Sequence, residues 1–246
     1  MRVSCNEERM VVISDLHIGN PYSRARRLLK SFLAYVEEEG YSLCINGDGV
    51  DIAQTSFQRI ATELPELLDA LRRIAKRNSS VYYVVGNHDM SMDHFLDDWG
   101  LMTVVPFLNV NSGDSRIRIE HGHLYDPFFV KYPWLYEFAT HLGGQLLKIS
   151  PDFYRVWVKF EGHKNRMLAK LQGGDKSSLA NEDPAFTAAA RELLERGFDS
   201  VIFGHTHVPG VLAVGEGKSY VNAGSWLRNG NYVLIEQGEV QLREWN

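Results

Sequence analysis

The chain has 246 residues, of which 44% are hydrophobic and 23% charged, the composition of an ordinary soluble globular protein. Its net charge of -5 gives no electrostatic reason to bind a nucleic-acid backbone, which argues against a nuclease. Its two cysteines, Cys5 and Cys44, provide neither a disulfide framework nor a thiolate metal site. No apolar run approaches the roughly 18 residues of a membrane span, and a cytoplasmic location is expected.

Strands and helices alternate over the first hundred residues. Short apolar and β-branched runs predict strands at 10–14, 42–46 and 81–85. Apolar residues with helical spacing predict helices at 23–39 and 57–78, with a kink or a new first turn at Pro65. This alternation predicts a largely parallel sheet with helices on its faces, in which ligands bind outside the carboxyl ends of the strands.

The second half of the chain carries shorter elements. We predict a short helix at 93–99, strand-like pieces at 103–110 and 117–120, a helix at 185–196, a strand at 200–203, and antiparallel strands from 211 to 245.

The stretch from about 125 to 172 is rich in aromatic residues and carries seven basic residues against four acidic ones. Leu135, Phe138, Leu142 and Leu146 predict one helix, and Phe153, Val156, Phe160, Met167 and Leu171 predict a second, with interruptions at Gly143-Gly144 and Pro151. We expect a single domain over 1–246 with this stretch as a helical, cap-like insertion. If the stretch is an ordinary packed hairpin, some of its aromatic side chains form its core. The others would line a cap over an amphipathic substrate, form a dimer contact or make peripheral contact with the inner membrane face.

Polar clusters directly follow most of the predicted strands. They are Asp15-Leu16-His17, Gly47-Asp48, Gly86-Asn87-His88-Asp89, His121-Gly122-His123 and Gly204-His205-Thr206-His207. Because side chains two apart on a strand project to the same side, His205 and His207 can both reach one centre. Five clusters at strand ends predict one shared site.

The donors in these clusters are carboxylates, imidazoles and one carboxamide, a set that suits Mn, Fe or Zn. Seven candidate ligands exceed the needs of one ion; they are Asp15, His17, Asp48, Asn87, His121, His205 and His207. A carboxylate shared between two divalent ions, with Mn preferred, would give the arrangement that clamps both oxygens of a displacement at phosphorus. Water held by such ions is acidified, so that hydroxide is available near neutral pH.

These strings closely resemble the calcineurin-like metallophosphoesterase family. Its D-x-H motif corresponds to residues 15–17, its G-D-x-x-D motif to 47–51, its G-N-H-[DE] motif to 86–89 and its G-H-x-H motif to 204–207, with His121 as the remaining histidine. The resemblance spans positions 12 to 207 in the correct order. It implies an α/β fold with a two-sheet β-sandwich core flanked by helices, and a metal-dependent phosphoesterase activity.

The resemblance also implies roles for single residues. Asp15, His17 and His207 would hold one ion, Asn87, His121 and His205 the other, and Asp48 would bridge them. His88 would contact the phosphate as a catalytic residue. Asp51 would lie behind the ligands. Apart from the resemblance, Asp89 is expected to be a structural cap or to lie behind the ligands, and His123 to be a loop residue or to lie behind them. Outside the motifs, Arg24 and Arg27 begin a cationic helix that is either a solvated face or a bidentate partner of a substrate phosphate.

Within the family, the chain looks most like the branch containing UDP-2,3-diacylglucosamine pyrophosphohydrolases of lipid A synthesis, because of its Ser14–His17 opening, its insertion and its closing Asn222–Trp226 string. The favoured substrate is therefore a small, lipid-linked nucleotide diphosphate. That branch usually has Arg where this chain has His88 and Asp where it has His123. A phosphodiesterase acting on nucleotides or other small diesters is the first alternative. A catalytically silent protein-binding scaffold is the second. The sequence does not indicate the oligomeric state.

Overall fold

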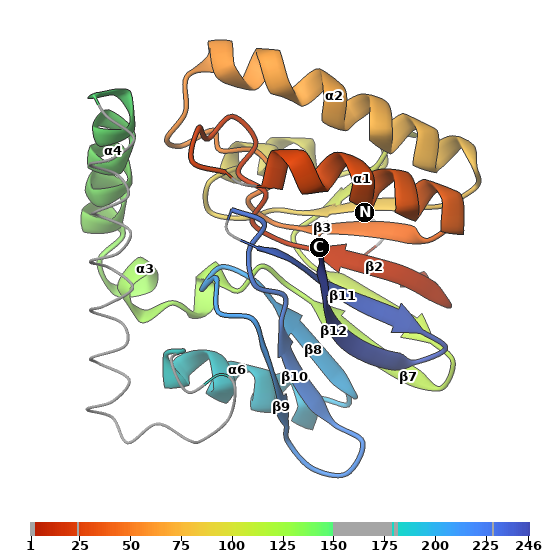
Figure 1. The fold of residues 1–246 in the computed structure, drawn as a ribbon. Coiled ribbons are helices and arrows are strands. Elements are labelled where there is room, and N and C mark those ends of the chain that lie inside the picture. The colour runs from red at the N-terminus through yellow and green to blue at the C-terminus, as the bar shows by residue number, and fades with distance from the viewer. Residues whose placement is uncertain (1–2, 24, 150–178, 180–181, 228) are drawn as a thin grey trace.

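The computed structural model describes residues 3–23, 25–149, 179, 182–227 and 229–246. They form two six-stranded sheets, sheet I and sheet II, that pack face to face (Figure 1). Helices cover the outer face of each sheet, so the core consists of four layers. The α/β fold with a two-sheet core, predicted from the sequence, is confirmed.

Sheet I has the strand order β12 (Glu239–Trp245), β11 (Gly230–Glu236), β2 (Arg9–Ile13), β3 (Ser42–Asn46), β4 (Val81–Val84) and β5 (Thr103–Val105). β2 to β5 are parallel, and β11 pairs antiparallel with both β2 and β12. Two amphipathic helices, α1 (Ala25–Glu39) and α2 (Phe57–Lys76), pack on the outer face of this sheet.

Sheet II has the strand order β1 (Ser4–Asn6), β6 (Leu108–Ser112), β7 (Ser115–Ile119), β8 (Ser200–Phe203), β10 (Ser219–Asn222) and β9 (Gly210–Ala213). β7, β8 and β10 are parallel. α6 (Pro184–Glu195) packs on the outer face of this sheet, and its N-terminus is capped by Asp183, whose carboxylate accepts the Ala185 N–H.

Strand β2 illustrates why the layers form. Its side chains alternate between the two faces of sheet I, and all are apolar after Arg9. Met10 and Val12 pack between the sheets, whereas Val11 and Ile13 pack under α1 and α2. A strand with two buried faces has apolar side chains at consecutive positions, and the sequence of β2 has this pattern.

Several predicted elements differ in the structure. The piece predicted at 103–110 is two strands, β5 and β6, which lie in different sheets on either side of Pro106, a residue that cannot donate to a strand ladder. The parallel sheet predicted from the alternation is confirmed for β2, β3 and β4, and the antiparallel strands β11 and β12 extend it into a mixed sheet. The helix predicted at 93–99 is a 3-10 helix, η1 (Met90–Phe95), and Pro65 lies inside one continuous α2.

The insertion begins with η2 (His123–Tyr125), α3 (Pro127–Lys131) and α4 (Pro133–Ile149). The helix predicted from Leu135 onward is confirmed as α4, but the predicted interruption at Gly143-Gly144 is wrong, because α4 continues through both glycines. A Cβ at Gly144 would lie 3.0 Å from the Gln54 carbonyl oxygen, so this glycine lets the helix approach the loop after β3. The second predicted helix and Pro151 lie outside the described residues, and the domain organisation stays a prediction.

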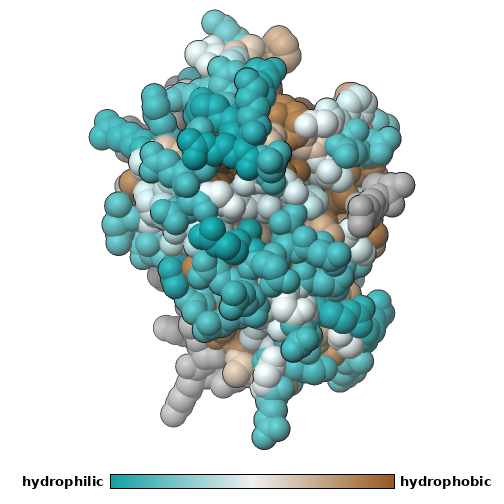
Figure 2. All heavy atoms as spheres, turned by 90° about the vertical axis from the view of Figure 1, so that its right-hand side faces the viewer, coloured by the Kyte–Doolittle hydropathy of each residue, from teal (hydrophilic) through white to brown (hydrophobic). Residues whose placement is uncertain are grey.

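The surface is uneven in polarity. The face on the right of Figure 1, which Figure 2 shows, is mostly hydrophilic with smaller apolar patches. Many of the exposed large apolar side chains in the described part of the chain lie on or beside α3, α4 and η1: Met90, Phe95, Trp99, Phe128, Val130, Tyr132, Trp134, Phe138 and Leu142. Within the same described ranges, no helix is both long and apolar enough to cross a membrane.

Candidate metal centre

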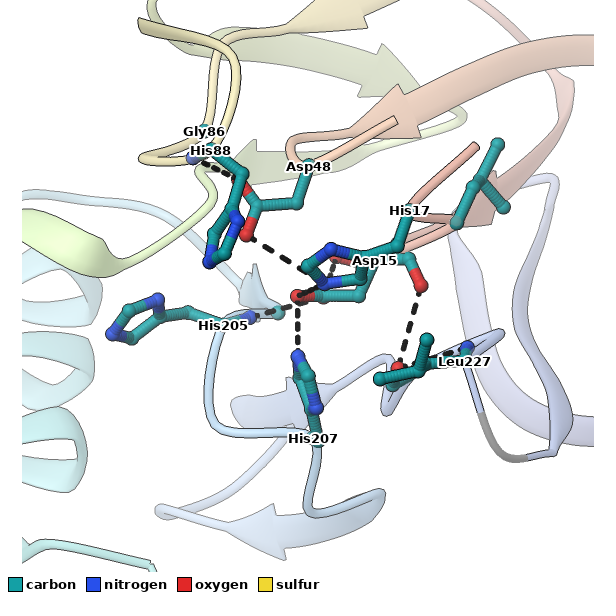
Figure 3. Close-up of polar contacts among 12 residues, drawn as sticks. Asp15, His17, Asp48, Gly86, His88, His205, His207 and Leu227 are labelled. Atoms are coloured by element: carbon teal, nitrogen blue, oxygen red, sulfur yellow. Dashed lines mark hydrogen bonds and ion pairs between the residues drawn. The ribbon is translucent and has the colours of Figure 1, made fainter. Parts of the chain in front are cut away.

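The five polar clusters follow the carboxyl ends of β2, β3, β4, β7 and β8, as predicted. Figure 3 shows side chains from four of these loops converging on one point: Asp15, His17, Asp48, His88 and His207. The ring of His205 points away from this point, and its backbone N–H faces Asp15. Three overlapping groups of three residues bring their ligand atoms within 4.8 Å of one another: Asp15 with His17 and His207, His17 with Asp48 and His88, and Asp15 with Asp48 and His121. Each group could hold a metal ion.

Backbone strain is concentrated at these loops. Seven non-glycine residues in the described part of the chain have positive φ, and five of them are candidate ligands: Asp15, His17, Asp48, His205 and His207. This conformation disfavours L-residues with a Cβ and persists only where the surroundings enforce it. The strain turns these side chains inward, so the loops are built around the site rather than around local backbone preference.

Two glycines allow the loops to approach closely. A Cβ at Gly86 would overlap the Asp48 carboxylate, and a Cβ at Gly204 would overlap the Ser14 hydroxyl. Both glycines belong to the polar clusters found in the sequence. Their role is to let one metal loop lie directly against the next.

Each of the two central carboxylates has one anchored oxygen and one that faces histidines. Asp15 Oδ2 lies 2.5 Å from Ser14 Oγ and accepts the His205 N–H at 3.1 Å, while Oδ1 lies 2.9 Å from His207 Nε2. Asp48 Oδ1 accepts the His88 N–H at 2.8 Å. Asp48 Oδ2 lies 3.9 Å from His17 Nε2 and 3.4 Å from His121 Nε2. One oxygen of Asp48 therefore faces histidines from two different loops.

The third oxygen donor, Asn87, is arranged in the same way. Its Nδ2 donates to the Tyr136 hydroxyl at 2.8 Å, which turns Oδ1 toward His205 Nδ1 at 2.8 Å and His121 Nε2 at 3.1 Å. His121 Nδ1 lies 2.9 Å from the Asn46 carbonyl oxygen, so Nε2 is the nitrogen that faces the centre. The two ring nitrogens that face Asn87 Oδ1 are therefore Nδ1 of His205 and Nε2 of His121.

His17 is the clearest sign that the residues suit a metal. Its ring is buried, and neither of its ring nitrogens has a hydrogen-bond partner. Nε2 lies 3.9 Å from both Asp15 Oδ1 and Asp48 Oδ2, too far for a hydrogen bond. Buried polar atoms are almost always paired in proteins, and a cation between these three atoms would satisfy all of them. The mixed nitrogen and oxygen donors fit Mn, Fe or Zn.

Asp51 and Asp89 lie behind the candidate ligands. Asp51 Oδ1 is 3.0 Å from His88 Nδ1, and Oδ2 is 3.5 Å from His17 Nδ1. Asp89 accepts N–H groups from Gly49 and Gly86 and lies 2.5 Å from the Tyr83 hydroxyl. Asp51 therefore orients the ring of His88 and lies close to the ring of His17, and Asp89 ties the loops after β3 and β4 together.

The remaining predicted site residues are less central. His123 begins η2, and its ring lies 5.5 Å from that of His121 and 6.4 Å from that of His205, with Nδ1 buried and without a hydrogen bond. Arg27 is exposed on α1. Arg24 lies outside the described residues, so its predicted contact with substrate stays a prediction.

The charges at the centre perturb one another strongly. Burial alone would raise the pKa of Asp15 and Asp48, but neighbouring histidines lower the pKa of Asp15 to about 2 and that of Asp48 well below its usual value. Burial lowers the pKa of a histidine, yet nearby aspartates raise the pKa to about 9 for His88 and to about 10 for His121. Burial and two adjacent histidines lower the pKa of His123 to about 3. Without metal, protonated histidines balance the charge of the buried carboxylates. Metal cations could balance the same charge.

Sequence reasoning missed three residues that hold the site. Asp126 Oδ2 lies 2.9 Å from His205 Nε2, and Tyr136 bonds Asn87. Glu182 is buried and accepts hydrogen bonds from Thr206, Tyr220 and Asn222, beneath the loop that carries His205 and His207. Asp126 precedes Pro127 at the start of a helix, a capping signal that marks a helix start but not a contact with a distant histidine.

The chain is similar to known proteins over most of its length. A sequence model described as calcineurin-like phosphoesterase matches residues 8–209. A protein of Shewanella piezotolerans named UDP-2,3-diacylglucosamine hydrolase is 23% identical, covering 96% of this chain and 98% of the relative. A protein of the same name from Shewanella pealeana is 24% identical with the same coverage. The crystal structure of hypothetical protein PH1004 from Pyrococcus horikoshii has a TM-score of 0.51 at 14% identity, covers 98% of this chain and 88% of that one, and supports the fold alone.

Proposed function

We propose that this chain, which belongs to the calcineurin-like phosphoesterase family, hydrolyses phosphoesters with two divalent metal ions held at the carboxyl ends of its strands. Membership of the family makes the protein a metal-dependent phosphoesterase. The number of ions, their ligands and the substrate are the parts that we propose.

One ion would be held by Asp15, His17 and His207, and the other by Asn87, His121 and His205. The observation that carries this assignment is the position of Asp48 Oδ2, which lies 3.9 Å from His17 of the first set and 3.4 Å from His121 of the second. A carboxylate oxygen between two ligand sets is what a bridge between two ions requires. We propose Mn as the metal, and Fe and Zn suit the same donors.

Bound ions supply charge neutralisation at the phosphate and a nucleophile at neutral pH. The chain's own residues then position and stabilise the reacting group. His88 lies next to His17, with ring centroids 4.8 Å apart, and its ring is steadied by Asp51 through Nδ1. The other ring nitrogen of His88 is therefore available to contact a phosphate oxygen or the leaving group, and this is its proposed catalytic role.

We propose a nucleotide-lipid diphosphate such as UDP-2,3-diacylglucosamine as the substrate. The names of the Shewanella relatives support this choice. So do the exposed aromatic side chains of α3 and α4 beside the site, because acyl chains bury apolar surface. A phosphodiesterase acting on nucleotides or other small diesters is the second candidate. His88 favours it, because the branch that contains UDP-2,3-diacylglucosamine pyrophosphohydrolases usually has Arg at this position.

We also propose that the same helices contact a membrane surface. Trp134 is 70% exposed and Phe138 is 62% exposed on α4. Liposome flotation, with and without anionic lipid, tests this contact, and a Trp134→Ala/Phe138→Ala variant should float less than the wild type. Recovery of both proteins in the bottom fraction, away from the floated liposomes, would rule the contact out.

Two substrates given side by side test the function. Purified protein with Mn(II) receives UDP-2,3-diacylglucosamine and bis-p-nitrophenyl phosphate, with Asp48→Ala as the inactive control. Turnover of the lipid nucleotide far above the generic diester, lost in the control, would support the proposed substrate. Metal-dependent cleavage of the diester alone would support the second candidate. Failure of the wild type to bind two ions would refute the two-metal mechanism.

A further inference from the structure

We infer that Tyr136 and Asp126, which belong to the insertion, are positioning residues for the second metal ion. The inference rests on the proposed two-metal function. The second ion is the one assigned to Asn87, His121 and His205. Two of these three residues are hydrogen-bonded to insertion side chains, so the insertion is part of the metal centre as well as a cover beside it.

Tyr136 selects the orientation of Asn87. A side-chain amide has one acceptor end and one donor end, and only the oxygen can ligate a metal. The Tyr136 hydroxyl accepts from Asn87 Nδ2 at 2.8 Å, which places the oxygen toward His205 and His121. Without that acceptor, the amide is no longer held with its oxygen toward the metal.

Asp126 performs the corresponding task for His205. Its Oδ2 lies 2.9 Å from His205 Nε2, while Nδ1 of the same ring faces Asn87 at 2.8 Å. A carboxylate on one ring nitrogen fixes the tautomer and makes the other nitrogen a better ligand. Asp126 also caps α3, since Oδ1 accepts the Phe128 N–H at 2.8 Å. The start of the insertion is therefore bonded directly to a metal loop.

Packing holds these two groups in place. The rings of Tyr136 and Phe129 are 5.0 Å apart, and Phe129 packs at 5.2 Å against His123. Farther along α4, Gly144 lies against the Gln54 backbone of the loop after β3. α3 and α4 thus contact the metal loops at several points, which gives the two hydrogen bonds a defined geometry.

The first set of ligands has supports of a different origin. Asp15 is held by Ser14 and by the Leu227 N–H, which donates to its carbonyl oxygen at 3.1 Å (Figure 3). His17 faces Asp51. These supports come from the strands and loops of the core. A change at Asp126 or Tyr136 should therefore affect the second ion more than the first.

The test titrates the wild type and three variants with Mn(II). Calorimetry and electron paramagnetic resonance monitor the binding. Tyr136→Phe keeps the ring that packs against Phe129 and removes the hydroxyl. Asp126→Asn keeps one oxygen, which cannot both cap α3 and accept from His205. Tyr132→Phe, at an exposed tyrosine one turn away, is the matched control. Melting temperatures of the metal-free proteins verify that each variant is folded.

We expect the wild type and Tyr132→Phe to bind two ions and to show the signal of a coupled manganese pair. Tyr136→Phe and Asp126→Asn should bind the second ion about 10- to 100-fold more weakly and show the signal of isolated Mn(II) at one equivalent. Two ions bound with wild-type affinity in both variants would overturn the inference and leave the proposed function intact. An equal loss in Tyr132→Phe would also overturn it. A wild type that binds fewer than two ions would instead refute the proposed function.

Discussion

Asp51 lies directly behind His88, with its Oδ1 atom 3.0 Å from the ring nitrogen Nδ1. The same carboxylate faces His17 with its other oxygen. A carboxylate that supports both a proposed catalytic ring and a proposed ligand couples the two functions. Substitution of His88 should therefore affect catalysis alone, whereas substitution of Asp51 should affect both catalysis and metal binding.

The first prediction concerns His88 itself. His88→Ala should lower kcat for bis-p-nitrophenyl phosphate by about 100- to 1000-fold, because a preorganised donor to the transition state is lost. The two ions should stay bound, since the Asp48 oxygen that faces the histidines is untouched. Steady-state kinetics and metal analysis on the same sample measure both quantities. Loss of metal in step with activity would show that His88 acts as a ligand instead.

The second prediction concerns Asp51. Burial lowers the pKa of His88, but Asp48 and Asp51 outweigh it and raise the pKa to about 9. In metal-free Asp51→Asn, one of these two charges is absent, so the pKa of His88 should move down toward its usual value of 6.5. NMR titration of the imidazole protons measures it. An unchanged pKa would show that Asp51 does not raise the pKa of His88.

The third prediction concerns removal of metal. Each ion that binds only the folded protein stabilises it by about 2.7 kcal/mol at 100 times its dissociation constant, so two ions contribute about twice that. For a chain of this size, chelation of both ions should lower Tm by about 10 to 20 °C. Differential scanning fluorimetry with EDTA, followed by readdition of Mn(II), measures the shift. Asp48→Ala provides the control, because loss of the bridging carboxylate should make its Tm respond less to both treatments.

The fourth prediction concerns Gly86, which leaves room for the Asp48 carboxylate because it has no Cβ. In Gly86→Ala the new methyl group would overlap that carboxylate, so the two loops must separate. We expect a loss of about 1 to 3 kcal/mol in the free energy of unfolding and weaker metal binding. Urea unfolding of the metal-free variant measures the first effect without the second. Wild-type stability and affinity together would mean that the loops can separate freely.

The fifth prediction concerns the buried carboxyl of Glu182. Burial raises its pKa to about 7 from 4.5, although hydrogen bonds from Tyr220, Thr206 and Asn222 favour the charged form. The folded protein therefore binds this proton more tightly than the unfolded chain. Stability from this group is greatest below pH 4.5 and falls as the pH rises through about 7, by on the order of 3 kcal/mol.

Glu182→Gln carries a neutral side chain at every pH. Relative to the wild type, the variant should gain stability between pH 5 and about pH 8. Urea unfolding of the metal-free proteins at both pH values gives this difference, because all other groups titrate in both. An identical pH dependence in the two proteins would contradict the raised pKa.

The sequence was a good guide wherever the signal is local. The runs at 10–14, 42–46, 81–85 and 200–203 are strands within one residue, because buried strands of a central sheet are continuous apolar runs. The break between β5 and β6 was missed although Pro106 marks it. Nothing in an apolar run tells which of two sheets each half will join, since both offer a buried face.

The candidate site shows the same division. The sequence by itself determined which side chains follow the strands, because strand ends and turn glycines are local features of the chain. Only the tertiary structure decided which oxygen of Asp48 faces the histidines and which nitrogen of His205 faces Asn87. It also brought in Tyr136, 49 positions from Asn87, and Asp126, 79 positions from His205. Contacts at such separations depend on how distant loops pack, and no local pattern of residue types encodes that packing.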